Sequence, residues 1–107
     1  MRIALIGGLD RSEQEMGAIA ARAGHVVELH AGHMGGRGSE TLKSAIDRAD
    51  FVVIVTELNS HGAVQLTRKL CQQGGRPPLL VRKCGSARFA QICEALRIQE
   101  ERQRLAS

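Results

Sequence analysis

Four short apolar runs alternate along this chain with segments whose apolar residues recur at helical spacing. The runs occupy residues 3–6, 25–30, 51–55 and 79–81. Parallel strands cannot be joined by a tight turn, so each pair needs a crossover connection, which is usually a helix. Strands that alternate with helices in this way predict a parallel sheet covered by helices.

The helical segments carry start and stop signals. A helix often begins after a side chain that accepts a hydrogen bond from a free backbone amide, and it often ends at glycine. Gly24 and the pair Gly74–Gly75 supply two such stops, and the third helix is expected over about 61–73. The expected caps of the other three helices are Ser12 with Glu15, Ser39 and Ser86.

The run 51–55 is the most continuous β-branched stretch, so we place it in the middle of the sheet, buried on both faces. Right-handed crossovers leave few arrangements for four strand–helix units. We expect a Rossmann-like, three-layer α/β sandwich with a four-stranded parallel sheet in the order 2-1-3-4, built by residues 1–107 as a single domain. Residues 99–107 have little apolar face, and we expect them to fray or to meet another subunit.

The composition fits one globular domain. Of the 107 residues, 43% are hydrophobic and 24% are charged, which excludes a disordered chain. No apolar run approaches the ~18 residues of a membrane span, and the first strand begins without a signal peptide, so we expect a cytoplasmic protein. An odd number of cysteines without a C-x-x-C pair argues against a disulfide framework or a zinc knuckle.

Charge is distributed unevenly. Residues 1–50 carry six basic and seven acidic side chains, whereas residues 51–107 carry nine basic and four acidic ones, and most of the cations are arginine. Arginine suits bidentate binding of carboxylate or phosphate, so the pattern favours an anionic partner; a solvated basic face explains it equally well. We do not expect nucleic acid, because the chain offers no Trp, no Tyr and two Phe for base stacking.

Ligands of a parallel sheet bind beyond the carboxyl ends of its strands, near the point where the strand order reverses. Four loops converge there and carry His30, His33 and His61, whereas His25 lies at the opposite end of the second strand. His61 falls in the first turn of a helix, where the dipole favours a neutral imidazole that can bind a metal. His30 has an alternative interpretation as a core histidine that donates to a backbone carbonyl.

Nucleotide and catalytic motifs are weak. Neither G-x-G-x-x-G nor a phosphate-binding P-loop occurs, which argues against a dinucleotide fold. Nucleophilic catalysis is possible on paper, in a small hydrolase or transferase with Cys84 or Ser60 as nucleophile and His61 as general base. The alternative for Cys84 is an inert, partly buried thiol, and our first expectation is a protein that is not an enzyme.

Several loop motifs together resemble one bacterial family. They are I-G-G-L-D-R at 6–11, H-A-G-H-M-G-G-R-G at 30–38, R-A-D-F-V-V at 48–53 and N-S-H-G at 59–62. The set is similar to the domain-of-unknown-function family DUF2325, and the resemblance extends to about Phe89. The His-x-Gly and Ser-His elements are specific because they occur together.

The resemblance implies a haem protein. Related proteins are associated with non-covalent haem b, reversible oxygen binding and self-association, so we expect a homodimer or larger homo-oligomer whose second subunit shields the haem. Imidazole is a normal axial ligand of haem iron, and arginine can bind the propionates. The residues assigned on this basis are His61, His30 and His33 as iron ligands, Arg11, Arg37 and Arg82 for the propionates, Leu9, Met34, Leu58 and Val64 for the porphyrin face, and Asn59 and Ser60 beside them.

A second function stays open besides the enzyme. The same loops could bind a small anion or a phosphorylated metabolite, because backbone amides and arginines at the edge of a parallel sheet suit such ligands. The groups that this module would use are the amides of Gly7 and Gly8 and the side chains of Asn59, Ser60, Arg11 and Arg82.

Overall fold

A computed structural model describes residues 1–8, 13–57 and 59–106 of the chain. Within these ranges the strands and helices are β1 (Arg2–Ile6), α1 (Glu13–Arg22), β2 (Val26–His30), α2 (Gly38–Arg48), β3 (Phe51–Val55), α3 (His61–Gln73), β4 (Leu79–Val81) and α4 (Ser86–Ala106). All strand pairs are parallel, and the sheet order is β2-β1-β3-β4. The predicted Rossmann-like sandwich and its strand order are confirmed.

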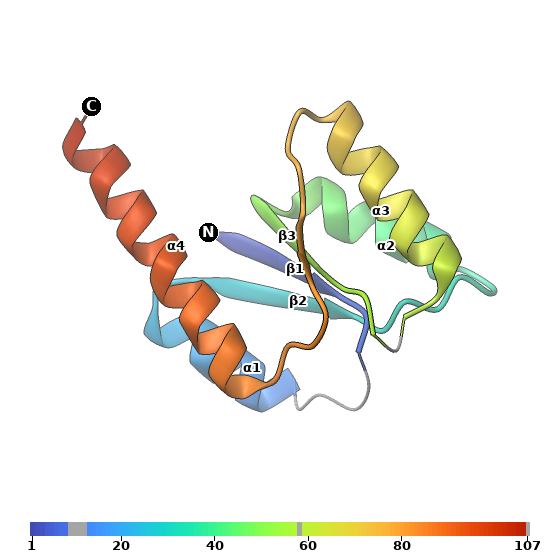
Figure 1. The fold of residues 1–107 in the computed structure, drawn as a ribbon, viewed down its shortest axis with the longest axis horizontal. Coiled ribbons are helices and arrows are strands. Elements are labelled where there is room, and N and C mark those ends of the chain that lie inside the picture. Colours follow the sequence, from blue (N-terminus) through green and yellow to red (C-terminus); the bar gives the residue numbers. More distant parts are fainter. Residues whose placement is uncertain (9–12, 58, 107) are drawn as a thin grey trace.

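Two apolar cores lie on opposite faces of the sheet. Ile3 and Leu5 of β1 belong to the core that α1 and α4 cover, whereas Ala4 and Ile6 belong to the core that α2 and α3 cover (Figure 1). Successive side chains of a strand enter opposite faces, so a strand covered on both sides is apolar throughout. β3 is buried from its second residue onward, as predicted for a central strand.

The third helix and the fourth strand have the predicted bounds, but two predicted caps are wrong. α2 begins at Gly38, and its N-cap is Arg37, whose side chain makes no capping hydrogen bond. Ser39 therefore lies inside α2. Ser86 is the first residue of α4, and its hydroxyl donates to Glu15 Oε1 at 2.5 Å. This bond joins the start of α4 to α1.

α4 includes most of the segment for which the sequence left fraying or a subunit contact open. It continues as a helix to Ala106. Its outer turns are polar and exposed. In the described ranges, no helix has an apolar stretch that would reach across a membrane.

His25 attaches α4 to the amino end of the sheet. The residue is 3% exposed, and Nε2 donates to the carbonyl of Cys93 at 2.9 Å. Nδ1 lies 3.1 Å from the amino group of Met1 and 3.4 Å from Glu100 Oε1. Because a carbonyl oxygen only accepts, Nε2 carries the proton. One buried ring thus joins the start of β1, the start of β2 and α4.

Replacing His25 with alanine removes a buried ring and leaves the Cys93 carbonyl without its donor. We expect His25→Ala to lower the free energy of unfolding by about 2–4 kcal/mol, measured by urea denaturation. His33→Ala removes the same side chain from an exposed position and should cost less than about 0.5 kcal/mol. Equal losses in the two variants would contradict the role assigned to His25.

Candidate functional site

The side chain of Asn59 joins the carboxyl ends of β1 and β3. Asn59 Nδ2 donates to the carbonyls of Val55 at 2.8 Å and Ile6 at 3.4 Å, and Oδ1 accepts from the amide of Ser60 at 2.9 Å. These bonds hold the loop after β3 against the end of β1. The sequence predicted Asn59 beside a cofactor, but three of its hydrogen bonds are made inside the protein.

Two glycines make room for this amide. A Cβ at Gly7 would collide with Asn59 Nδ2, and a Cβ at Gly32 would collide with Asn59 Oδ1. Their φ angles are +94° and +91°, a region that other residues adopt only at a cost. The amide of Gly7 also donates to the carbonyl of His30 at 2.7 Å. The ends of β1, β2 and β3 are therefore fixed by one network around Asn59.

Ser60 connects the loop after β2 to the start of α3. As the N-cap of α3, its Oγ accepts from the amide of Ala63 at 3.0 Å and donates to the carbonyl of Gly32 at 2.6 Å. One hydroxyl thus caps a helix and holds a neighbouring loop. Because its proton is bound to a carbonyl, Ser60 is not prepared as a nucleophile.

His30 makes hydrogen bonds with both ring nitrogens. Nδ1 accepts from the amide of Gly32 at 3.0 Å, so Nε2 carries the proton, 3.2 Å from the carbonyl of Gly38 and 3.1 Å from Thr41 Oγ1. A metal ligand needs a free lone pair, and the lone pair of Nδ1 already accepts a bond. This geometry is that of the alternative interpretation, a histidine that donates to a backbone carbonyl.

His30 and His33 line an open groove between β2 and α2. The groove has a volume of about 730 Å³, and Arg37 and Arg48 also line it. Arg48 forms a two-point ion pair with Glu28, at 2.5 and 3.2 Å, which raises the pKa of the guanidinium. The structure thus brings together three predicted site residues, His30, His33 and Arg37, in a polar setting.

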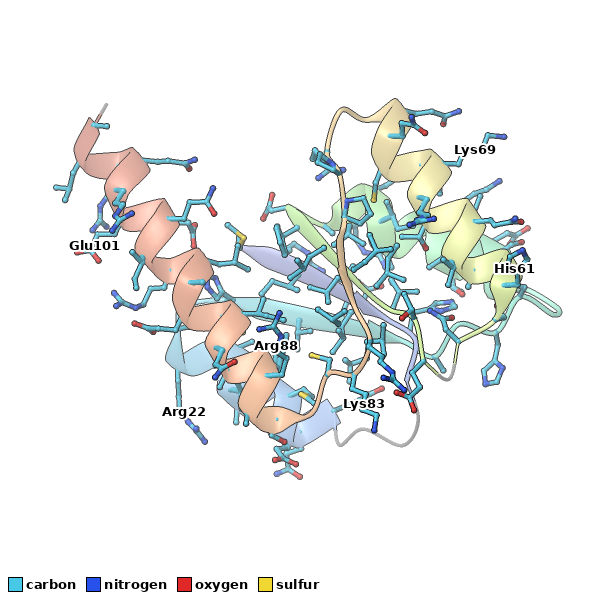
Figure 2. The ribbon with its side chains drawn as sticks, in the orientation of Figure 1. Arg22, His61, Lys69, Lys83, Arg88 and Glu101 are labelled. Carbon is cyan, nitrogen blue, oxygen red and sulfur yellow. The ribbon has the colours of Figure 1, made fainter. Side chains whose placement is uncertain are left out.

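His61 begins α3 on the same edge of the sheet, and its imidazole is exposed (Figure 2). Among the described residues, nothing forms a hydrogen bond or an ion pair with this ring. Its backbone is fixed by the preceding residue, Ser60, and Met34 lies beside the following one, since a Cβ at Gly62 would be 3.6 Å from Met34 Cγ. His33 is also exposed but belongs to the glycine-rich loop 32–38. His61 therefore combines a fixed backbone with an available ring.

Arg82 lies at the opposite end of this edge. It follows β4, which is separated from β2 by both other strands. Its Nε is 3.7 Å from Glu57 Oε2, and Lys83 Nζ is 4.0 Å from the same oxygen. That oxygen is buried and has no hydrogen bond among the described residues, so the two cations compensate its charge. Arg82 is therefore not grouped with His30 and Arg37.

Some predicted residues cannot be placed in the site, and others were missed. Val64 is half-buried and packs against the core beneath α2 and α3. Thr41 and Arg48 line the groove although the sequence analysis did not name them, and their helical spacing from Arg37 on the second helix was the available signal. The predicted residues that lie outside the described ranges are Leu9, Arg11, Ser12 and Leu58.

The donors on this edge suit haem better than a metal held by protein ligands alone. Among the described residues, no three His, Cys, Asp or Glu side chains gather closely enough to hold a metal ion. Haem needs one or two axial ligands from the protein, because the porphyrin supplies the other nitrogens. The exposed imidazole of His61, Met34 beside Gly62 and Arg37 at the start of α2 are the described groups that would offer haem an axial donor, an apolar contact and a cation.

The geometry gives less support to the other two functions. The amide of Gly7 and the polar groups of Asn59 and Ser60, three of the groups expected to bind an anion, are used in the network. Cys84 is 3% exposed, which removes it from contact with a substrate. Burial, together with the nearby Cys84, raises the pKa of Cys93 to about 11 and keeps that thiol protonated.

A family model matches this chain. The model of a family described as "Uncharacterized protein conserved in bacteria (DUF2325)" matches residues 2–96, which is most of the chain. The matched segment includes the Asn59 network, the groove and His61. The searches of curated proteins and of solved structures gave no match.

The collision between Gly32 and Asn59 can be measured by a double-mutant cycle. We expect Gly32→Ala to cost at least about 3 kcal/mol of unfolding free energy, because a methyl group meets Oδ1 and the φ angle is positive. In an Asn59→Ala background the collision is gone, and the same change should cost about 1–2 kcal/mol. Additive costs would show that the two residues do not meet.

The three cysteines are buried and form no disulfide, and burial raises the pKa of Cys71 as well as that of Cys93. We therefore expect Ellman's reagent at about pH 8 to label the folded chain at least about 100-fold more slowly than the urea-unfolded chain, which should release three equivalents. Rapid labelling of one thiol in the folded protein would restore the nucleophile hypothesis.

Proposed function

The chain belongs to the bacterial DUF2325 family, and from this premise we propose that it binds haem b non-covalently at the carboxyl edge of the sheet and takes up oxygen or another diatomic gas there. The haem would supply a ferrous iron that binds the gas reversibly. The protein would supply an axial imidazole, cations for the propionates and a second subunit to exclude water. No enzymatic step is required of it.

The proposal rests on the exposed ring of His61 and on its fixed backbone. Its ring is exposed and has no bonded partner among the described residues, while its backbone is held by the Ser60 cap and the Asn59 network. A ligand that is already positioned loses little conformational freedom on binding. We assign the axial position to His61 for this reason.

The other two histidines rank below it. His30 would have to give up the hydrogen bond from Gly32 before Nδ1 could bind iron, and that bond also orders the loop. His33 has an exposed ring but lies among glycines, so binding would have to order its loop. His33 is thus the candidate for a second axial ligand, and His30 supports the loop that carries it.

Propionate binding is assigned to Arg37. Its side chain is 87% exposed, and its contact with Glu40 at 3.3 Å is a surface ion pair, which a carboxylate of the ligand can replace at small cost. Met34, half-buried next to the first turn of α3, offers a flexible apolar contact for a porphyrin face. Because the edge is open to solvent, a second copy of the chain is required to cover the other face.

The proposal also places the protein in a reducing compartment such as the cytoplasm. None of the three cysteines forms a disulfide. Thiols of this kind are typical of intracellular proteins. Fractionation of the cells that make the protein tests this part of the proposal separately.

Haemin titration followed by absorbance tests the function. The chain has neither Trp nor Tyr, so its own near-ultraviolet absorbance is small and a Soret band is easily seen. We expect a saturable Soret shift in the full chain and at least about tenfold weaker binding in His61→Ala. Gln65→Ala, an exposed change one turn along α3, is the matched control and should bind as the unchanged chain does.

Two results would contradict the proposal. The first is a full chain that gives no saturable Soret shift with either ferric or reduced haem. The second is equal haem binding by His61→Ala and by the Gln65→Ala control, which would show that another residue binds the iron. His33→Ala distinguishes one axial protein ligand from two, because loss of a second imidazole changes the visible bands of the reduced haem.

A further inference from the structure

The sheet has an open edge at β4. β4 is the last strand in the order β2-β1-β3-β4, and among the described residues no strand pairs with its outer side. The carbonyl of Val81 accepts from the amide of Thr56, next to β3, at 2.8 Å. Successive residues of a strand direct their backbone groups to opposite sides, so the amide and carbonyl of Leu80 face outward. Such an edge can pair with a further extended chain.

Two grooves flank this edge, one on each face of the sheet. The groove on the α3 side has a volume of about 530 Å³, and its lining includes Arg68, Arg76, Pro77 and Pro78. The groove on the α4 side has a volume of about 270 Å³, and its lining includes Phe51, Leu79, Ile92 and Leu96. Side chains of a strand alternate between its two faces. A strand added outside β4 would therefore direct its side chains in turn toward one groove and toward the other.

Three arginines beside the grooves have no acidic partner. Arg68 and Arg76 line the groove on the α3 side, and Arg88 lines the groove on the α4 side. All three are exposed, and none of them forms an ion pair with another described residue. The sequence contains no acidic residue from 59 to 93. The surface is positively charged, and guanidinium groups suit carboxylates.

The acidic residues that bound this stretch of sequence face other cations. Glu57 Oε2 lies 3.7 Å from Arg82 Nε, and Glu94 Oε1 lies 2.5 Å from Arg97 Nη2. Arg76 is held in place, because its Nη1 donates to the carbonyl of Ala49 at the end of α2. A cation that is positioned in advance loses little conformational freedom when it binds a carboxylate from another molecule.

The chemistry of this surface favours a peptide over nucleic acid. Base stacking needs exposed aromatic rings, but Phe89 is 0% exposed and Phe51 packs against the core. The groove on the α4 side is largely apolar, and Leu80 is 39% exposed. An extended peptide offers backbone groups for the edge, apolar side chains for this groove and carboxylates for the arginines.

We propose that the β4 edge binds an extended segment of a partner protein in which acidic and apolar residues alternate. The backbone of the segment pairs with Leu80, its acidic side chains face Arg68 and Arg76, and its apolar side chains enter the groove on the α4 side. Pro77 and Pro78 lack amide hydrogens and keep the pairing short. The interface is therefore small, and we expect an affinity on the order of micromolar.

This surface is separate from the proposed haem site. The groove of His30 and His33 adjoins β2, which forms the other edge of the sheet. The peptide should therefore bind the full chain whether or not haemin is present, so a failure of one proposal does not affect the other.

Fluorescence anisotropy with a labelled peptide of alternating Glu and Val tests the proposal. We expect saturable binding by the full chain and about fivefold weaker binding by Arg68→Gln. Lys69→Gln is the matched control, because it removes the same charge from a side chain that points away from β4 (Figure 2). A peptide of the same composition with all Glu at one end should bind at least about tenfold more weakly. No saturable binding, equal effects of the two variants, or equal binding of the two peptides overturns the proposal.

A second comparison tests the backbone pairing. Leu80→Pro removes the outward amide hydrogen and leaves the bond between Val81 and Thr56 in place, whereas Leu80→Ala keeps the amide. We expect Leu80→Pro to bind the alternating peptide at least about tenfold more weakly than Leu80→Ala, with urea denaturation to check that both variants fold. A peptide that is N-methylated at every residue has no amide donor and should not bind the unchanged chain. Equal binding by the two folded variants, or binding of the methylated peptide, contradicts strand pairing.

Two other occupants are distinguished by the same variants. Single-stranded RNA that displaces the peptide, and that binds Arg68→Gln more weakly than Lys69→Gln, would assign the surface to nucleic acid. A dimer in sedimentation velocity that is lost in Arg68→Gln and kept in Lys69→Gln would assign it to a second copy of the chain. Either result overturns the proposal.

Discussion

The carboxyl edge of this sheet depends on one amide side chain. Asn59 holds the ends of β1 and β3 directly, and it fits there because Gly7 and Gly32 leave room for it. Ser60, the next residue, extends the same network to the loop after β2 and to the start of α3. The network thereby joins β1, β3, the loop after β2 and the start of α3, while the ring of His61 stays exposed to solvent.

This constraint gives the three histidines of the edge different roles. His30 is part of the support, because both of its nitrogens are bonded within the loop. His33 has an available ring on a glycine-rich segment, and His61 has an available ring on a fixed helix terminus. Binding favours ligands that are positioned in advance, so the network that occupies His30 also favours His61. The same network uses the Gly7 amide and the side chains of Asn59 and Ser60, which were also expected to bind an anion.

The fold could be predicted from the sequence because its strands, helices and crossovers follow local periodicity and chain geometry. The bounds of α3 and β4 and the central position of β3 follow from apolar spacing and from Gly and Pro stops. The start of α2 could not be predicted in this way. The helix begins without a side-chain cap, and the expected cap, Ser39, lies inside it. The outer turns of α4 have little apolar face, and the ion pairs of Arg97 with Glu94 and Glu101 stabilise the helix there.

The sequence placed the candidate residues at one edge of the sheet, but it could not give their contacts. Topology brings His30, His33 and Arg37 to one groove, but it does not reveal that His30 is already bonded or that Arg82 pairs with Glu57 at the far end of the edge. The partners of His30 lie in the loop after β2 and in the first turn of α2, and the partner of Arg82 lies in the loop after β3, so only the folded chain shows these contacts. Asn59 and Ser60 were predicted beside a cofactor. Their hydrogen bonds within the protein give them a structural role in the network instead.

The most direct test of the account is nitrogen-15 NMR of the histidine rings, recorded before and after addition of haemin. The account predicts that His30 is fixed as the Nε2–H tautomer in both states, that His61 exchanges freely before addition, and that the His61 signals then shift and broaden beside the iron. Unchanged His61 signals in the presence of bound haemin, or loss of the fixed His30 tautomer, would contradict it.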